Sequence, residues 1–326
     1  MTGIGYISPL LLRHADLQAA LSNSGWRRDR VLVDATSLLG ASEPLLIECN
    51  DGVRLTAQHT PALKQSGRVA ILLHGWEGSA GSLHVVSAGN RLWHEGFRIV
   101  RINMRDHGDS QHLNREIFHS CRLDEMIEAT RWVRDRFPGE SLYLAGFSLG
   151  GNFALRIAAA DGPALGLARV AAVCPVLDPE ETMVALDSGL KIYQQYYLRK
   201  WRRSLERKAE LFPADYAFGK LSRFRSLREM TSFFVTNYTE FPDLASYLRG
   251  YAITGDRLAG LAVPSGILLA DDDPVVPAAS VARLARPATL SVHLTRWGGH
   301  CGFLADYRLR TWSDDYLVRE FSPSTP

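Results

Sequence analysis

The chain has 326 residues, of which 46% are hydrophobic and 22% charged, and its formal net charge is only +2. This length and composition are typical of a globular protein with a large core, and they exclude a fibrous or disordered chain. No run of residues reaches the roughly 18 apolar positions of a membrane-spanning helix, and we recognise no signal peptide. No nucleic-acid recognition motif occurs, so we expect no nucleic-acid partner.

The first expected elements are two strands at residues 45–49 and 53–59, joined by Asn-Asp-Gly, which is a favourable hairpin turn. From residue 69 onward, strand-like apolar runs alternate with helix-like stretches. The runs cover residues 69–73, 97–102, 141–145, 169–174, 266–270 and 290–295. This alternation predicts an α/β fold with a mostly parallel, eight-stranded sheet, helices on both faces, and a ligand site at the carboxyl ends of the strands.

The alternation stops between residues 174 and 266, where we expect an inserted helical cap at 178–262, flanked by core parts at 1–177 and 263–326. Within this cap, residues 191–228 contain eleven Lys and Arg against three acidic residues, a local net charge of +8. Tyr, Trp and Leu are interleaved with them, as in an amphipathic helix. Either the charged face is simply solvated, or it contacts anionic lipid headgroups.

The sequence Gly-Phe-Ser-Leu-Gly at residues 146–150 stands between a strand-like run and a helix-like run at 152–160. In that context a Gly-x-Ser-x-Gly motif is typical of a nucleophile elbow, a strained turn that exposes the serine. The flanking glycines suit a turn in which backbone segments approach closely. We therefore expect Ser148 to be a nucleophile that needs a base, an orienting acid and oxyanion donors.

Candidates for the acid and the base follow Ser148 in the chain order that such a triad requires. Asp271, Asp272 and Asp273 come directly after one strand-like run, and His300 comes after the next. We expect His300 to be the base. Asp273 is favoured as the acid because a proline fixes the backbone after it, with Asp271 or Asp272 as alternatives.

The strand-like run at 69–73 ends in His-Gly-Trp-Glu-Gly-Ser at 74–79, a glycine-rich turn. Such a turn can direct a backbone N–H group toward a substrate oxygen. We expect the oxyanion hole to consist of the N–H groups of Trp76 and Leu149. His74 is expected to hold this loop through a hydrogen bond.

The cysteines are widely spaced and match no metal-binding or redox pattern, so we expect neither a metal site nor disulfides, as is usual in the cytoplasm. They are Cys49, Cys121, Cys174 and Cys301. Cys301 is interpreted as a packing residue. His107, His112 and His119 share one loop without the spacing of zinc ligands. His119 also precedes Asp124 in a His-x-x-x-x-Asp spacing found in some acyltransferases, although Asp124 fits a helix start.

Together these segments resemble the α/β-hydrolases, and more narrowly the bacterial YheT-like hydrolases and the animal ABHD lipases. The segments that carry the resemblance are 74–79, 104–110, 146–152, 273–274 and 298–303. One departure is Asp-His-Gly at 106–108, where many members have Arg-Gly-His-Gly.

The resemblance implies a serine esterase of the α/β-hydrolase fold that needs no cofactor. Its expected substrates are short- to medium-chain acyl esters or acylglycerols, cleaved through an acyl-enzyme on Ser148. A thioesterase or acyltransferase would use the same triad. A non-catalytic module that binds lipid or a protein partner is a further alternative. The expected location is cytoplasmic, at the inner membrane face if the basic segment binds lipid.

Overall fold

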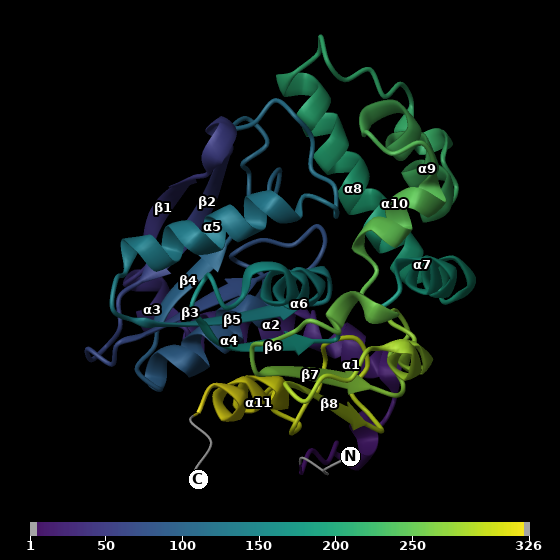
Figure 1. Ribbon diagram of the computed structural model, residues 1–326. Helices are drawn as coiled ribbons and strands as arrows, with labels where there is room; N and C mark the ends of the chain where they lie inside the picture. Colours follow the sequence, from purple (N-terminus) through teal and green to yellow (C-terminus); the bar gives the residue numbers. More distant parts are fainter. Residues whose placement is uncertain (1–4, 323–326) are drawn as a thin grey trace.

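The computed structural model describes residues 5–322, and these contain one eight-stranded sheet in the order β1-β2-β4-β3-β5-β6-β7-β8 (Figure 1). The strands are β1 (Glu43–Glu48), β2 (Arg54–Thr60), β3 (Arg68–Leu73), β4 (Arg98–Ile102), β5 (Ser141–Phe147), β6 (Leu167–Val173), β7 (Ser265–Ala270) and β8 (Leu290–Thr295). β2 is antiparallel to both β1 and β4, whereas the remaining pairs are parallel. The predicted α/β fold is confirmed.

The turn residues and one buried pair of side chains determine the conformation and the register of the hairpin of β1 and β2. Asp51 and Gly52 have φ angles of 58° and 76°, a left-handed conformation that Asp and Gly tolerate better than most residues. Ile47 pairs with Leu55, and both side chains are fully buried. A shift of one residue would turn these side chains to the other face, so their burial fixes the register.

Helices cover both faces of the sheet (Figure 1). The N-terminal helices are α1 (Ala15–Ser22), α2 (Gly25–Asp34) and α3 (Thr36–Gly40), and the core helices are α4 (Leu83–His94), α5 (Leu123–Arg136), α6 (Leu149–Asp161) and α11 (Trp312–Phe321). α4 packs against α11 and α2 on one face, and α5 packs against α6 on the other. Because both faces are covered, the central strands are continuous apolar runs rather than alternating ones.

Four helices lie between β6 and β7, namely α7 (Pro179–Ser188), α8 (Lys191–Leu211), α9 (Leu227–Tyr238) and α10 (Leu244–Tyr251). They form a separate layer at the upper right of Figure 1. They fall within the segment expected to be a cap, and we call them the cap helices. The boundaries of the cap at 178 and 262 stay a prediction. None of the helices within residues 5–322 has the length and apolar character needed to cross a membrane.

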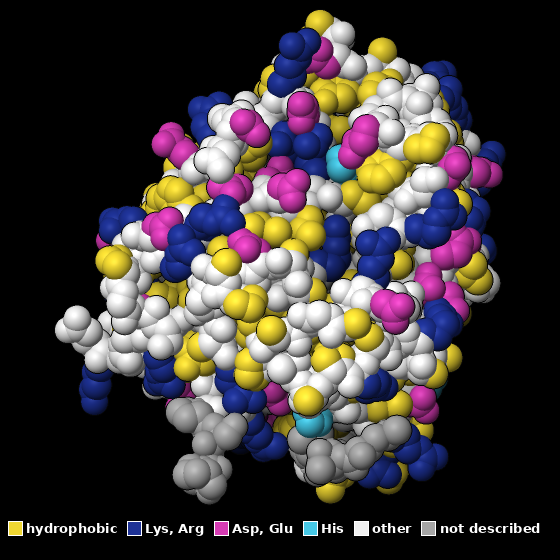
Figure 2. Space-filling view, viewed as in Figure 1, with side chains coloured by type: hydrophobic (Ala, Val, Ile, Leu, Met, Phe, Trp, Pro, Cys, Tyr) yellow, Lys and Arg dark blue, Asp and Glu magenta, His cyan; other side chains and the backbone are white. Residues whose placement is uncertain are grey.

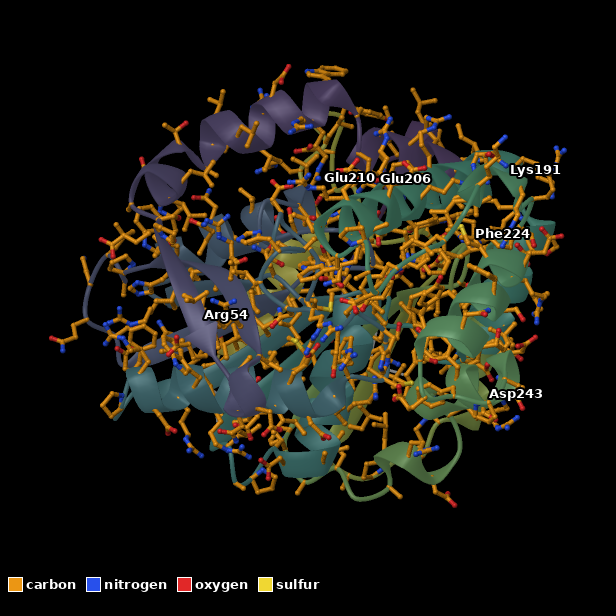
Figure 3. All side chains as sticks on the ribbon, turned by 90° about the horizontal axis from the view of Figure 1, so that it is seen from above. Arg54, Lys191, Glu206, Glu210, Phe224 and Asp243 are labelled. Atoms are coloured by element: carbon orange, nitrogen blue, oxygen red, sulfur yellow. The ribbon has the colours of Figure 1, made fainter. Side chains whose placement is uncertain are left out.

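The longest cap helix, α8, is amphipathic, but its basic residues are not all solvated. Leu198, Trp201 and Leu205 form its buried face. Figure 3 labels Lys191 near one end of α8 and Glu206 near the other. All three of Lys200, Arg202 and Lys208 donate hydrogen bonds to other segments of the chain. The positive charge that this helix presents to solvent is therefore smaller than a count of its basic residues suggests.

Lys208 connects α8 to the loop that follows β4. Its side chain is 1% exposed, and its Nζ lies 2.8 Å from Oδ1 of Asp106. Nζ also donates to the carbonyl oxygens of Gln111, Asn114 and Glu116. A buried ammonium group is stable only when such partners replace its hydration. The ion pair and the three carbonyl groups therefore hold the cap against the core.

Replacing Lys208 with alanine is expected to destabilise the protein by about 3–5 kcal/mol, because it leaves the Asp106 carboxylate buried without its partner. Arg207 is the matched control. Its side chain is 58% exposed and pairs only with Glu210, so Arg207→Ala should cost less than about 1 kcal/mol. Urea unfolding of both variants measures the difference. Equal midpoints would show that Lys208 does not stabilise the cap.

Candidate active site

Ser148 lies on a strained turn between the end of β5 and the start of α6. Its φ and ψ angles are 52° and −118°, a region that non-glycine residues rarely occupy. A Cβ atom at Gly146 would overlap the backbone of Gly150, and one at Gly150 would overlap the carbonyl group of His74. Only glycine therefore fits at these two positions without a steric clash. The strand-turn-helix context predicted for the nucleophile elbow is confirmed.

The structure brings Ser148, His300 and Asp273 together at the carboxyl ends of β5, β7 and β8. Nε2 of His300 lies 3.0 Å from Oγ of Ser148. Nδ1 of His300 lies 2.9 Å and 3.1 Å from the two carboxylate oxygens of Asp273. When the imidazole is neutral and donates its Nδ1 proton to Asp273, Nε2 can accept the serine proton.

The three adjacent aspartates have different surroundings. Oδ1 of Asp273 accepts the backbone N–H groups of Val275 at 2.8 Å and Val276 at 3.0 Å, and its carboxylate is fully buried. Asp272 instead accepts the N–H of Gly299, and Asp271 is exposed. Of the three aspartates, only Asp273 forms a hydrogen bond with the imidazole of His300. Asp273 is also the acid favoured from the sequence, and its catalytic role stays a prediction.

The proton affinity of His300 depends on two opposing effects. Burial by itself lowers the pKa of the imidazole, because the charged form loses its hydration. The negative charge of Asp273, together with the adjacent Cys301 thiol and the Asp273 hydrogen bond, more than offsets burial and raises the pKa from 6.5 to about 9. His300 is therefore a strong base that holds its proton firmly at neutral pH.

Trp76 and Leu149, whose N–H groups are proposed for the oxyanion hole, line the same cavity as Ser148. A Cβ atom at Gly75 would lie 3.3 Å from Cβ of Ser148, so the turn after β3 lies against the nucleophile. Neither the N–H of Trp76 nor that of Leu149 donates to another group of residues 5–322. Leu149 is also the first residue of α6, where the helix dipole favours negative charge.

His74 has the structural role expected from the sequence. It is fully buried; Nδ1 lies 2.7 Å from the carbonyl oxygen of Gly75, and Nε2 accepts the N–H of Met104. Burial, followed by the charge of His107, keeps its pKa well below the usual value. His74 is therefore neutral and ties the turn after β3 to the turn after β4.

A cavity that is partly open to solvent lies over Ser148 between the core and the cap helices. Trp76 stacks on Tyr197 of α8 with ring centroids 5.5 Å apart, and it meets Trp201 edge to face. The rest of the lining is mainly apolar and includes Leu149, Val176, Met183, Leu186, Leu227, Phe234 and Val275. A mainly apolar lining with a few polar groups is typical of small-molecule sites.

His119 and Thr182 are two of the polar residues in this lining. Sequence reasoning considers His119 only for its spacing to Asp124 and as a zinc ligand, and it does not single out Thr182. Nδ1 of His119 and Oγ1 of Thr182 are buried and have no hydrogen-bond partner among the described residues. Burial, followed by the charges of Arg122 and Arg105, lowers the pKa of His119 to about 3, so its ring is neutral. Asp124 is exposed on the first turn of α5, as expected for a helix start.

Asn152 connects the elbow helix to the start and end of the cap. Its side-chain amide donates to the carbonyl oxygens of Val176, at 2.8 Å, and Tyr251, at 2.7 Å. It is fully buried. The sequence marks Asn152 only through the family resemblance, because nothing in the local pattern indicates which distant carbonyl groups its side chain would reach.

The sequence model of the alpha/beta hydrolase fold matches residues 69–307, which is most of the chain. The chain therefore belongs to the α/β-hydrolase fold family. Within this family it is similar to the Escherichia coli protein named "Putative esterase YheT", with 24% identity over 287 residues, 83% of this chain and 84% of that protein. The family and this relative support a hydrolase, and the YheT-like resemblance is confirmed.

Two further relatives share less of their own length with this chain. The medium-chain fatty acid ethyl ester synthase/esterase 2 of Saccharomyces cerevisiae is 22% identical over 290 residues, covering 78% of this chain and 62% of the yeast protein. Human ABHD15 is 25% identical over 244 residues, covering 72% of this chain and 48% of the human protein.

Solved structures with the same fold include an esterase of Pyrococcus furiosus, Pf2001, with a TM-score of 0.57 and 16% identity over 88% of this chain and 94% of that one. Est1E of Butyrivibrio proteoclasticus, solved with ferulic acid, has a TM-score of 0.53 and 17% identity over 86% of this chain and 100% of that one. At these identities the likeness concerns the fold alone.

Proposed function

We propose that the protein is a serine hydrolase that cleaves carboxylic esters through an acyl-enzyme on Ser148. The observation that carries this proposal is the hydrogen-bonded chain from Ser148 through His300 to the buried Asp273. This chain of hydrogen bonds joins a nucleophile on a strained turn to a base and an orienting acid.

In the proposed mechanism, Nε2 of His300 takes the proton of Ser148 as Oγ attacks the acyl carbon. The N–H groups of Trp76 and Leu149 stabilise the negative charge that develops on the carbonyl oxygen. His300 then gives the proton to the leaving alcohol, and the reverse sequence with water releases the acid. Asp273 orients the imidazole and stabilises its charged form throughout.

For the substrate we propose short- to medium-chain acyl esters or acylglycerols. The aromatic and aliphatic lining of the cavity supports an acyl chain, and the name of the yeast relative refers to medium-chain fatty acid ethyl esters. The unpartnered groups of His119 and Thr182 can bind the free hydroxyl groups that an acylglycerol carries. That relative is named as both a synthase and an esterase, so transfer of the acyl group to an alcohol is the alternative reaction.

The test combines a fluorophosphonate probe with a series of esters of increasing acyl length. We expect the probe to label Ser148, and we expect hydrolysis of 4-nitrophenyl esters and monoacylglycerols to peak at a short or medium chain. Added alcohol distinguishes hydrolysis from acyl transfer, and acyl thioesters test the thioesterase alternative. A folded protein that is neither labelled nor active would favour a non-catalytic binding module.

The ester hydrolysis rate is expected to increase with pH. His300 must be neutral to accept the serine proton, and its pKa is raised to about 9. The value of kcat/KM should therefore rise tenfold per pH unit from about pH 7 and level off above about pH 9. Initial rates in overlapping buffers measure this. A profile that is already flat at about pH 7 would contradict the raised pKa.

We also propose that the protein is cytoplasmic and that the first half of α8 contacts anionic membrane surfaces. Leu190, Ile192 and Tyr196 are 54%, 71% and 47% exposed, and the basic residues Lys191 and Arg199 beside them are exposed as well. In Figure 2, Lys and Arg side chains are scattered over the cap among acidic and hydrophobic ones. Such a surface binds lipid headgroups through apolar contacts and positive charge together.

Liposome flotation tests the membrane contact. We expect more protein to float with vesicles that contain phosphatidylserine than with neutral vesicles, and we expect added salt to reduce the difference because it screens the charges. The double variant Lys191→Glu/Arg199→Glu should lose the preference. Equal recovery with both kinds of vesicle would show that the charged face is simply solvated.

A further inference from the structure

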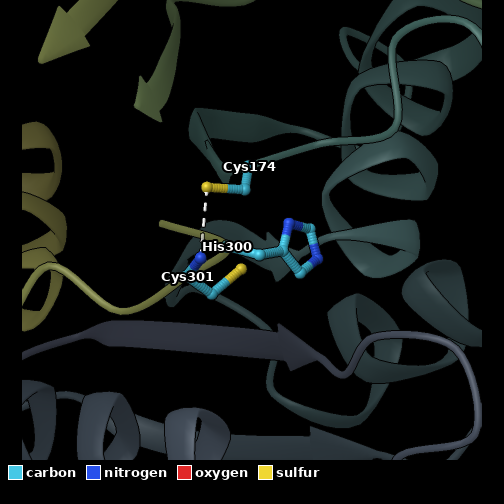
Figure 4. Close-up of side chains that lie close together, drawn as sticks. All are labelled: Cys174, His300 and Cys301. Carbon is cyan, nitrogen blue, oxygen red and sulfur yellow. Dashed lines mark hydrogen bonds between the residues drawn. The ribbon is translucent and has the colours of Figure 1, made fainter. Parts of the chain in front are cut away.

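Two cysteines lie beside the proposed base (Figure 4). Cys174 directly follows β6, and Cys301 directly follows His300. The two sulfur atoms and one ring nitrogen of His300 all lie within 4.8 Å of one another. Over residues 5–322, this is the single group of three or more His, Cys, Asp or Glu side chains close enough to share a metal ion.

The backbone holds the two thiols side by side. Cys174 and Cys301 have φ angles of 45° and 60°, a left-handed conformation that is unusual for cysteine. The N–H of Cys301 donates to the sulfur of Cys174 at 3.3 Å, and the dashed line in Figure 4 marks this bond. The two residues are 0% and 3% exposed, respectively. The ligand atoms are thus brought together by two chain segments, Cys174 after β6 and His300-Cys301 after β8.

We propose that Cys174, Cys301 and His300 form an inhibitory site for a thiophilic divalent cation such as Zn²⁺. Two cysteine sulfurs and one imidazole nitrogen are a ligand set that Zn²⁺ prefers. With Zn–S bonds of about 2.3 Å and Zn–N bonds of about 2.0 Å, tetrahedral ligand atoms are about 3.5–3.8 Å apart. From separations of up to 4.8 Å, the ligand atoms must move together by up to about 1.0–1.3 Å, and each thiol gives its proton to the buffer as the metal binds.

Metal binding at this cluster is incompatible with the triad. Both ring nitrogens of His300 are engaged, one with Asp273 and the other with Ser148. A metal ion that takes either nitrogen removes one of these hydrogen bonds, and hydrolysis stops. This part of the inference rests on the proposed function, whereas metal binding itself does not.

Binding is tested first without substrate, on reduced and metal-free protein titrated with Co²⁺. We expect one Co²⁺ per chain, with the thiolate charge-transfer band and the visible bands of a tetrahedral site. Cys174→Ser and Cys301→Ser should weaken or abolish the charge-transfer band. Cys49→Ser and Cys121→Ser are matched controls that should retain it, because both residues lie outside the cluster. Co²⁺ binding without the thiolate band would overturn the proposal.

Inhibition is tested with Zn²⁺ on each variant, relative to its own metal-free rate. We expect inhibition that EDTA reverses, and at least a tenfold higher half-inhibitory concentration for Cys174→Ser and Cys301→Ser than for the two controls. Equal inhibition of all variants would overturn the inhibitory site. If Co²⁺ binds through the thiols but the protein hydrolyses no ester, the proposed function fails and the metal site stands.

A measurement on the unmodified protein covers the case in which a cysteine variant does not fold. X-ray absorption at the zinc edge should show two sulfur ligands and at least one nitrogen or oxygen ligand. A spectrum with only nitrogen and oxygen ligands would place Zn²⁺ elsewhere and overturn the proposal.

Discussion

Ser148→Ala is expected to lower kcat for ester hydrolysis by about 10⁴- to 10⁶-fold, the range found when a triad nucleophile is removed. The loss is large because without Oγ no acyl-enzyme forms, and the His300 base has no hydroxyl to activate. KM should change little, since the cavity lining is untouched. Steady-state kinetics on the best ester of the chain-length series measures both constants.

The control for this variant is the fluorophosphonate probe, which should label the wild-type protein at Ser148 and leave Ser148→Ala unlabelled. Circular dichroism should show the same fold in both proteins. Alanine removes a polar atom without adding bulk, so the positive φ of residue 148 is the remaining source of strain. Activity within tenfold of the wild type would refute the acyl-enzyme mechanism.

Asp273→Asn is expected to lower kcat by about 10⁴-fold, because an amide stabilises the wrong tautomer of the imidazole and leaves its charged form without a counter-charge. Asp271→Asn is the matched control two residues away. Asp271 is exposed, so this variant should keep a rate close to that of the wild type. The pair of variants decides between Asp273 and Asp271 by activity rather than by position.

A second readout separates a role for Asp273 in catalysis from a purely structural one. The Asp273 charge raises the pKa of His300, so in Asp273→Asn the pH at which the residual kcat/KM levels off should move to lower values. Asp273 also accepts the N–H groups of Val275 and Val276, and asparagine keeps an acceptor oxygen for them. An unchanged pH profile with a reduced rate would contradict the electrostatic role.

The sequence predicts the core of this fold well because its signals are local. Each parallel strand is a short apolar run that is buried on both faces. The Asn-Asp-Gly turn marks the hairpin that precedes these strands in the chain. Ser148 is marked by the glycines that its turn requires, and the acid and the base follow strand ends. Because β5, β7 and β8 run parallel in one sheet, their carboxyl ends lie at the same edge and bring the three residues there.

What the sequence does not predict depends on side chains that meet across long separations. Composition treats Lys208 as one of eleven basic residues in the cap, although it is buried against Asp106, 102 positions earlier. Cys174 and Cys301 are 127 positions apart and match no spacing motif. His119 and Thr182 line one cavity from different segments. Such contacts follow from tertiary packing, between cap and core or within the core, which has no short-range sequence pattern.

The cap helices are attached to the core by side-chain hydrogen bonds as well as by the chain itself. The cap is joined covalently to the core only between β6 and β7, yet Lys208 is bonded to the loop after β4 and Lys200 to the carbonyl oxygen of Glu77 after β3. Swinging the cap outward as a lid would expose a buried ammonium and carboxylate at once. These bonds therefore oppose an outward swing of the cap helices.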